Sequence, residues 1–392
     1  MATRLLTNIG ELITNDPHLG DASPVGRLHD AALVVDDQRV VWVGSASEAP
    51  DADERYDARG AAVVPGFVDS HTHLVFAGER SDEFEARMAG QRYDGGGIAR
   101  TVAATRAASD ESLREESAVR LGALRAGGVT TVEVKSGYAL DVAGEARLVR
   151  LASEITREVT FLGAHVVPLD YARDRDAYVE LVAGEMMRAT DSARWTDVFC
   201  DDGAFDVDEA RVVLEAGRAR GHELRLHANQ IRDIGAVALG VELDCASVDH
   251  CTYLSDADVE RLAGSDTVAT LLPGAEFSTR SPYPSGRRLL DAGVVVALAT
   301  DCNPGTSYVT SMSFVIALAV REMGLSVDEA LWAATRGGAR ALRRDDIGHL
   351  GVGARADLAV LNAPRAAHLA YRPGSSLVRE VWRAADGADA LH

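Results

Sequence analysis

The chain alternates short apolar segments with longer amphipathic ones. Eight short segments are rich in β-branched residues and end in polar residues, as expected for buried parallel strands. They occupy residues 62–71, 128–137, 159–168, 196–203, 223–230, 245–252, 267–274 and 294–303. Eight such strands separated by helical patterns predict an α/β protein with a closed, parallel (β/α)8 TIM-like barrel over residues 62–351. An open, doubly wound sheet is the alternative.

The helical pattern between the strands is clearest at residues 206–221. This stretch begins with an acidic turn, continues with an apolar stripe of Val212, Val213 and Ala216, and ends at Gly221. An acidic first turn and a terminal glycine are typical of helix ends.

The two ends of the chain break this alternation. Residues 1–61 contain a strand-like stretch in which Asp36 and Asp37 indicate a turn, and residues 352–392 contain two further strand-like stretches. We expect these two ends to pair in a small β-sandwich domain beside the barrel, which would bring the termini near each other.

Composition narrows the possible partners. Of the 392 residues, 47% are hydrophobic, and the formal net charge is -20. This charge disfavours binding to nucleic acid or to an anionic membrane surface. The start of the chain lacks the pattern of a signal peptide, which predicts a cytoplasmic protein. The four cysteines lack metal-site spacing and are expected to be reduced thiols, and the single lysine, Lys135, is interpreted as a compositional bias.

Four residues at predicted strand ends can ligate a metal. His71 and His73 are two apart on the first strand, so they face the same side, while His227 ends the fifth strand and Asp301 the eighth. Three imidazoles and one carboxylate suit one catalytic transition metal, zinc or iron. Individually, these residues are also compatible with core histidines and a helix cap. The fourth strand has no lysine that a second metal would need as a bridging ligand.

These residues carry a resemblance to the amidohydrolase superfamily of metal-dependent hydrolases. Its motif is "PGFVDSHTH", followed by His227, His250 and Asp301 at later strand ends. Within the superfamily, "FAGERSDEF", "GGGI", "KSGYAL", "LGAH", "HANQ" and "TDCNPGTS" resemble the imidazolonepropionase family. This resemblance implies hydrolysis of 4-imidazolone-5-propanoate to N-formimidoyl-L-glutamate in histidine degradation, by a metal-activated water.

The resemblance also implies roles for individual residues. Asp301 is expected to ligate the metal and transfer a proton, and His250 is expected to hydrogen-bond the attacking oxygen or to support the ligands. Arg80 is expected to bind the propionate tail of this small-molecule substrate, unless it only forms a local ion pair with Glu79, Asp82 or Glu83. Further substrate contacts are expected from Tyr93, Tyr138, His165, Gln230, Asn303, Gly305 and Thr306. Some relatives carry glutamate in place of Gln230, and a glutamine cannot act as a base.

Two other functions stay open at this point. The first is hydrolysis or deamination of another cyclic amide or amidine, such as a nucleobase. A nucleobase has no carboxylate tail for Arg80 to bind, so the role of Arg80 distinguishes the two substrate classes. The second is a barrel that has lost catalysis and acts as a binding scaffold. The sequence does not specify an oligomeric state, and a homodimer is left as an open alternative.

Overall fold

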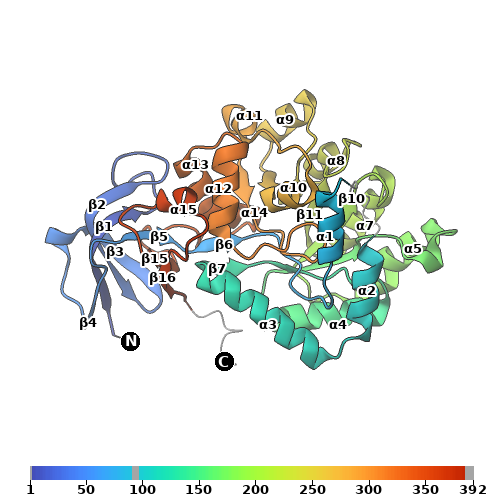
Figure 1. The fold of residues 1–392 in the computed structure, drawn as a ribbon, viewed down its shortest axis with the longest axis horizontal. Helices are drawn as coiled ribbons and strands as arrows, with labels where there is room; N and C mark the ends of the chain where they lie inside the picture. The colour runs from blue at the N-terminus through green and yellow to red at the C-terminus, as the bar shows by residue number, and fades with distance from the viewer. Residues whose placement is uncertain (1, 91–96, 385–392) are drawn as a thin grey trace.

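The computed structural model describes residues 2–90 and 97–384 and shows a barrel beside a sheet built from both ends of the chain (Figure 1). The strands of the barrel run parallel, and all eight predicted strand segments contain observed strands. They are β6 (Phe67–Asp69), β7 (Val129–Val132), β8 (Val134–Lys135), β9 (Val159–Ala164), β10 (Trp195–Cys200), β11 (Glu223–Ala228), β12 (Ser247–His250), β13 (Val268–Leu271) and β14 (Val296–Leu298). β7 and β8 are two parts of the second barrel strand.

The first and last barrel strands meet, which closes the ring. β6 pairs with β7, and β8 to β14 form one continuous parallel sheet. Beyond β6 and β14, an isolated parallel bridge joins Thr72 to Cys302. It is reinforced by backbone hydrogen bonds of 3.0 Å from Asp301 N to His71 O and from His73 N to Cys302 O. The barrel prediction is therefore confirmed, and the open sheet is excluded.

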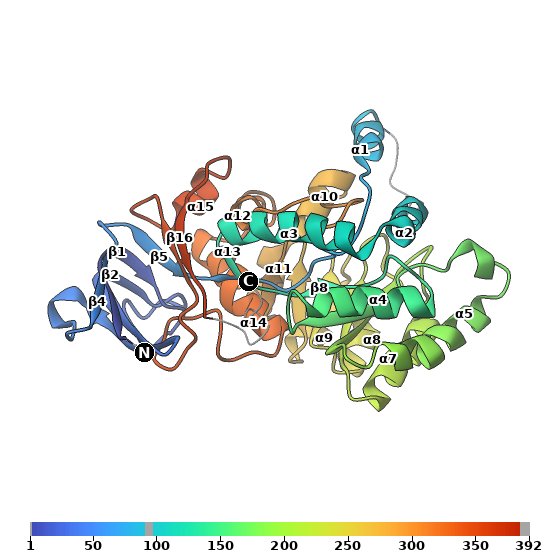
Figure 2. The same ribbon diagram turned by 90° about the horizontal axis from the view of Figure 1, so that it is seen from below.

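Helices surround the barrel (Figures 1 and 2). The α-helices are α1 (Ser81–Met88), α2 (Ile98–Ala107), α3 (Asp110–Ala126), α4 (Val142–Ser153), α5 (Arg175–Leu181), α6 (Met187–Ala189), α7 (Val207–Ala219), α8 (Ala236–Glu242), α9 (Asp256–Ala263), α10 (Pro273–Thr279), α11 (Gly286–Asp291), α12 (Met312–Glu322), α13 (Val327–Trp332), α14 (Gly338–Ala341) and α15 (His368–Tyr371). Two 3-10 helices, η1 (Ala46–Glu48) and η2 (Leu169–Tyr171), and two π-helical turns, η3 (Val182–Met186) and η4 (Ala333–Gly337), complete the set. No helix among the described residues has both the length and the apolar character of a membrane span.

The predicted helix at 206–221 is observed as α7. Asp206 caps its first turn in a capping box with Glu209, which satisfies otherwise unpaired backbone N–H groups. Val213 is fully buried, but Val212 is 49% exposed. Of the two adjacent valines in the apolar stripe, only Val213 is therefore buried. Adjacent helix positions lie about 100° apart, so two neighbouring valines cannot both occupy the centre of one buried face.

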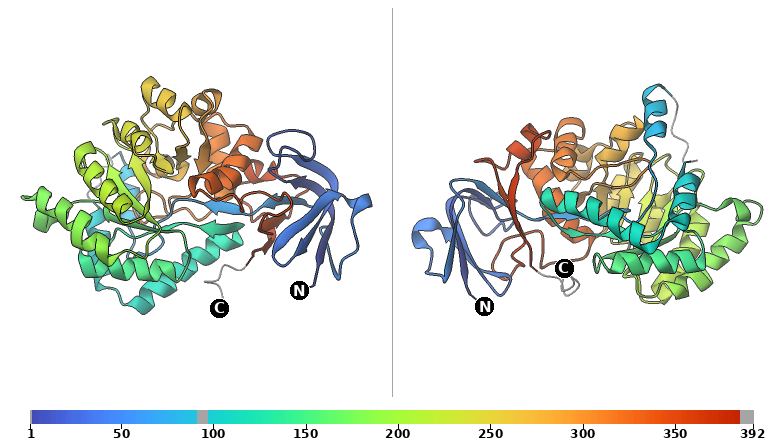
Figure 3. Two further views of the ribbon diagram at one scale, coloured as in Figure 1. Left: turned by 180° about the vertical axis from the view of Figure 1, so that it is seen from behind. Right: turned by 60° about the horizontal axis from the view of Figure 1, so that its bottom comes forward.

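Both ends of the chain enter one sheet of seven strands (Figure 3). Its strands are β1 (Arg4–Ile13), β2 (Arg27–Asp36), β3 (Arg39–Ser45), β4 (Glu54–Asp57), β5 (Ala62–Pro65), β15 (Leu358–Leu361) and β16 (Val378–Trp382). The order is β16-β15-β5-β1-β2-β3, and β4 also pairs with β1. The predicted turn is present between β2 and β3, where Asp37 and Gln38 have positive φ. β5 continues almost directly into β6 and connects this sheet to the barrel.

Asn15 links the terminal sheet to the barrel. It is buried just after β1, and its Nδ2 donates to Thr335 Oγ1 at 2.7 Å and to Gly348 O at 2.8 Å. Asn15 has a φ of 52°, and the exposed Asn8 has a similar φ of 54°, so both residues lie in the left-handed region. Asparagine tolerates this left-handed conformation better than alanine does.

We expect Asn15→Ala to lower the free energy of unfolding by about 2–3 kcal/mol, because it strands buried hydrogen-bonding groups and adds backbone strain. Asn8→Ala is the matched control, since it introduces similar strain at an exposed position and should cost about 1 kcal/mol. Urea denaturation of the two variants measures the difference. Equal losses would show that the buried hydrogen bonds of Asn15 contribute nothing.

Candidate active site

Five ligand-capable side chains converge at the carboxyl ends of the barrel strands. His71 and His73 follow β6, His227 lies on β11, His250 ends β12, and Asp301 follows β14. All five are at most 3% exposed. Parallel strands in a closed barrel direct their carboxyl ends to one mouth, which brings together residues far apart in sequence.

The distances between these groups are short. The ring centroids of His71 and His227 are 4.5 Å apart, and those of His227 and His250 are 5.4 Å apart. Asp301 Oδ1 lies 3.5 Å from His71 Nε2 and 3.6 Å from His73 Nε2. Two sets have ligand atoms within 4.8 Å of one another, and His71 belongs to both: His71, His227 and His250, and His71, His73 and Asp301.

Two of the imidazoles each have a buried carboxylate beside Nδ1. Nδ1 of His71 lies 2.8 Å from Asp249 Oδ2, and Nδ1 of His227 lies 2.9 Å from Asp197 Oδ2. Within the described part of the chain, His71 Nε2 is buried without a hydrogen-bond partner. Burial, together with neighbouring positive groups, lowers the pKa of His71 well below its ordinary value. A neutral imidazole oriented by a carboxylate is what a metal ligand requires, so these residues fit a metal ion.

Asp301 is fixed by the loop that follows it. Asn303 Nδ2 donates to Asp301 O at 2.7 Å, and Asn303 Oδ1 accepts from the backbone N–H groups of Gly305 and Thr306 at 2.8 Å each. Thr306 Oγ1 lies 3.4 Å from Asp301 Oδ2. Burial raises the pKa of Asp301 well above its ordinary value. The turn chemistry of Asn303 and Thr306 is therefore present, and their contact with substrate stays a prediction.

Arg80 takes part in the local ion pair and also lines the site. Its Nε and Nη2 donate to the two carboxylate oxygens of Glu83 at 2.9 and 2.6 Å. The guanidinium is buried, and its face lies against Gly305, where a Cβ atom would approach Arg80 Nη1 to 2.3 Å. Glycine at 305 is therefore needed for this close approach. The two alternative roles for Arg80 are compatible.

The remaining predicted contacts surround a small cavity of about 30 Å³, which borders both the histidines and Arg80. His165 is stacked beside His73, and its Nδ1 donates to Gly137 O at 2.9 Å. Burial lowers the pKa of His165 to about 3, so this ring is neutral. Tyr138 and Gln230 also line the cavity, whereas Tyr93 lies outside the described residues.

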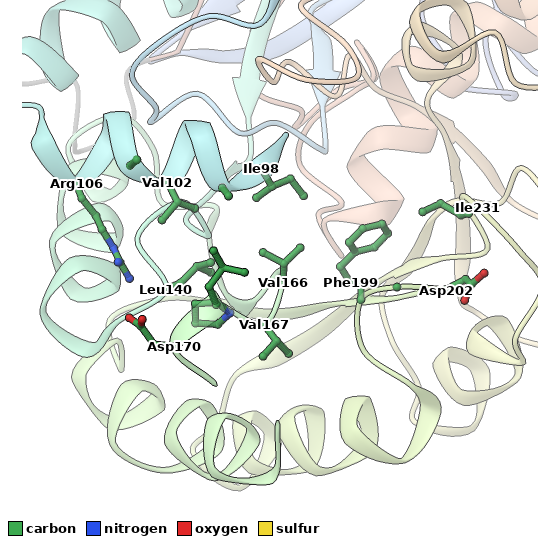
Figure 4. Close-up of a pocket in the computed structure, with 16 residues that line it drawn as sticks. Ile98, Val102, Arg106, Leu140, Val166, Val167, Asp170, Phe199, Asp202 and Ile231 are labelled. Carbon is green, nitrogen blue, oxygen red and sulfur yellow. The ribbon is translucent and has the colours of Figure 1, made fainter. Parts of the chain in front are cut away.

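Two further kinds of residue at this site are not predicted from the sequence. Ile98 and Phe199 line this cavity and also a neighbouring apolar cavity of about 430 Å³, which Figure 4 shows between α2 and β10. Asp197 and Asp249 lie beside Nδ1 of His227 and His71 and orient the two rings. A carboxylate inside an otherwise apolar strand segment was the available signal for the two aspartates.

The family match and the similar curated proteins point to the same group of enzymes. The family described as "Amidohydrolase family" matches residues 95–384. Imidazolonepropionase of Streptomyces griseus is 60% identical over 384 residues, covering 98% of each chain, and that of Mycolicibacterium smegmatis is 61% identical, covering 98% of this chain and 97% of the relative.

Solved structures share the fold at low sequence identity. A triazine hydrolase variant has a TM-score of 0.76 at 18% identity, covering 97% of this chain and 93% of that chain. A mutant of atrazine chlorohydrolase from Arthrobacter aurescens, complexed with zinc and atraton, has a TM-score of 0.73 at 19% identity, covering 97% and 94%.

Proposed function

The chain belongs to the imidazolonepropionases of the amidohydrolase family, and from this we propose that its converging histidines and Asp301 hold one metal ion that serves hydrolysis. The protein hydrolyses the ring amide of 4-imidazolone-5-propanoate to N-formimidoyl-L-glutamate, a step of histidine degradation. Deamination and a non-catalytic scaffold are not favoured.

The arrangement of the imidazoles is the observation that carries the metal proposal. Asp249 and Asp197 engage Nδ1 of His71 and His227, so the Nε2 atoms remain available as ligands. His73 and Asp301 complete the proposed ligand set. Zinc or iron suits three imidazoles and a carboxylate. When bound, such an ion activates water at neutral pH and polarises the carbonyl of the amide.

The side chains around this position divide the remaining chemistry. We assign Asp301 the transfer of a proton from the attacking water to the ring nitrogen, so that the carbon–nitrogen bond breaks and the nitrogen leaves protonated. His250 lies beside His227 and is assigned hydrogen bonding to the oxygen that gains charge during attack. Gln230 can orient the ring but cannot accept the proton.

Substrate binding follows from the cavity. Arg80 is assigned the propionate, because a buried guanidinium suits a carboxylate and no nucleobase presents one. Tyr138 and His165 border the same space and are assigned polar contacts with the ring, together with Asn303, Gly305 and Thr306. Tyr93 keeps its assignment as a substrate contact on sequence grounds.

Removal of the metal is expected to abolish hydrolysis. After treatment with a chelator and dialysis, the rate at which the ultraviolet absorbance of 4-imidazolone-5-propanoate disappears should fall at least about 1,000-fold. About one equivalent of Zn²⁺ or Fe²⁺ per chain should restore it, and calorimetry should give the same stoichiometry.

Two variants locate the ion in this experiment. His73→Ala should weaken binding of the ion, whereas His29→Ala, which removes an exposed imidazole from the terminal sheet, should not. Full activity in a sample with less than about a tenth of an equivalent of metal would reject the metal proposal.

We also propose that residues 1–61 and 352–392 form a small β-sandwich domain and residues 62–351 the hydrolase barrel. Support comes from a separate apolar cluster in the terminal sheet, to which Leu6, Ile9 and Trp382 belong. The strand pairing of β5 with β1 and β15 shows that the sheet extends to Pro65.

A further inference from the structure

The only lysine of the chain contacts buried carboxylates, two of which lie beside His71 and His227. Lys135, on β8, is completely buried. Its Nζ lies 2.8 Å from Asp197 Oδ2, 2.9 Å from Glu133 Oε1 and 3.9 Å from Asp249 Oδ2. One ammonium group is therefore surrounded by three buried carboxylates.

Two of these carboxylates are the ones that hold the histidines. Asp197 Oδ2, which contacts Lys135, also lies 2.9 Å from His227 Nδ1. Asp197 Oδ1 accepts a hydrogen bond from the backbone N–H of His227 at 3.1 Å. The Asp249 oxygen nearest Lys135 lies 2.8 Å from His71 Nδ1. Lys135 is thus connected through one carboxylate to His227 and through another to His71.

This arrangement is unusual for the inside of a barrel. Lys135, Asp197 and Asp249 lie on the second, fourth and sixth strands, and alternate strands contribute one layer of the interior. Such layers normally contain branched apolar residues, because burial of charge is costly unless opposite charges compensate it. Here Lys135 and Arg225, whose Nη2 lies 3.3 Å from Asp249 Oδ2, are the compensating charges.

Lys135 is suited to hold these carboxylates and not to react with substrate. It does not line the substrate cavity. Burial opposes its positive charge, but Asp197 and Glu133 outweigh burial, and the pKa of Lys135 is raised. A lysine that stays protonated cannot act as a base or a nucleophile.

We propose that Lys135 is a positioning residue: its ammonium group fixes Asp197 and Asp249, which in turn aim His227 and His71 at the metal ion. This inference rests on the metal site proposed above. Arg225 cannot replace Lys135, because its guanidinium contacts Asp249 and also donates to Ser70 O and Ala341 O at 2.7 and 2.9 Å.

The first test is metal affinity in Lys135→Met, which keeps the length of the side chain and removes its charge. We expect zinc, measured by competition with a chromophoric chelator, to bind about 10- to 100-fold more weakly. The control is Arg194→Met, which removes another cation that bridges carboxylates of the barrel, Glu158 and Glu223, at 2.8 and 2.9 Å. It should lower thermal stability and leave zinc affinity unchanged.

The second test uses the unmutated protein and does not depend on how Lys135→Met folds. Protein labelled with ¹⁵N and ¹³C only in lysine contains one labelled side chain, so its spectrum reports Lys135 alone. Titration with Zn²⁺ should shift the side-chain resonance, and the shift should saturate with the affinity found by chelator competition, because bound imidazoles polarise the carboxylates that contact the ammonium group.

The outcomes separate this inference from the metal proposal. Failure of the unmutated protein to bind zinc would reject the metal site itself. Normal zinc affinity in folded Lys135→Met, or an unmoved lysine resonance in a protein saturated with zinc, would overturn the positioning role and leave the metal site standing.

Discussion

Asp301→Asn is expected to lower kcat by about 1,000- to 10,000-fold, which corresponds to about 4–5.5 kcal/mol of transition-state stabilisation. Asparagine has nearly the same shape, so the loop contacts with Asn303 and Thr306 can persist. An amide cannot accept the proton of the attacking water, and it is a poorer ligand than a carboxylate. The variant therefore loses both functions assigned to this residue.

The measurement is single-turnover hydrolysis at saturating zinc, with bound metal determined in the same sample. Saturation separates loss of proton transfer from loss of the ion. Asp202→Asn is the control, since Asp202 is exposed near the same mouth and pairs only weakly with Arg232 at 3.4 Å. A metal-loaded Asp301→Asn enzyme that kept more than about a tenth of the activity would refute the proton-transfer role.

The barrel could be predicted because its strands are buried on both faces and therefore read as continuous apolar segments. All eight segments were located, and the terminal strands were recognised as separate from the barrel. Pairing across the chain was harder to predict. Residues 62–71 read as one strand, but β5 pairs with the terminal sheet and β6 with β7. Gly66 and Pro65 lie at this change, and neither residue specifies which partner each half takes.

The ligand-capable residues could be found from their places at strand ends. The charged residues that orient these ligands could not be found in this way, because their role depends on which inward-facing charges meet across the barrel. Lys135 was interpreted as a compositional feature, yet it joins Asp197 to Asp249. The sequence shows a charge inside an apolar strand, and only the three-dimensional structure shows that its neighbours on two other strands carry the opposite charge.

Arg80 provides the second large effect, because binding of the propionate distinguishes this substrate from rings without a carboxylate. Arg80→Met should lower kcat/KM by about 30- to 5,000-fold, since truncating one partner of a buried, hydrogen-bonded charge pair costs about 2–5 kcal/mol. Methionine keeps much of the packing against Gly305. With an imidazolone that lacks the propionate, kcat/KM should not fall. The unmutated enzyme and Arg80→Met should hydrolyse this compound equally slowly.

Glu83→Gln decides whether Arg80 acts on substrate or only on the fold. Glu83 holds two nitrogens of Arg80 and is 23% exposed, so its replacement by glutamine removes the ion pair but leaves the guanidinium in the cavity. If Arg80 binds the propionate, kcat/KM of the Glu83→Gln variant should fall less than about tenfold, because the positive charge of Arg80 is still present. If Glu83→Gln and Arg80→Met were equally impaired, and if the loss extended to the ring without a carboxylate, the contribution of Arg80 would be the ion pair alone. Comparison of the two variants on the two substrates therefore separates recognition of the propionate from local structure.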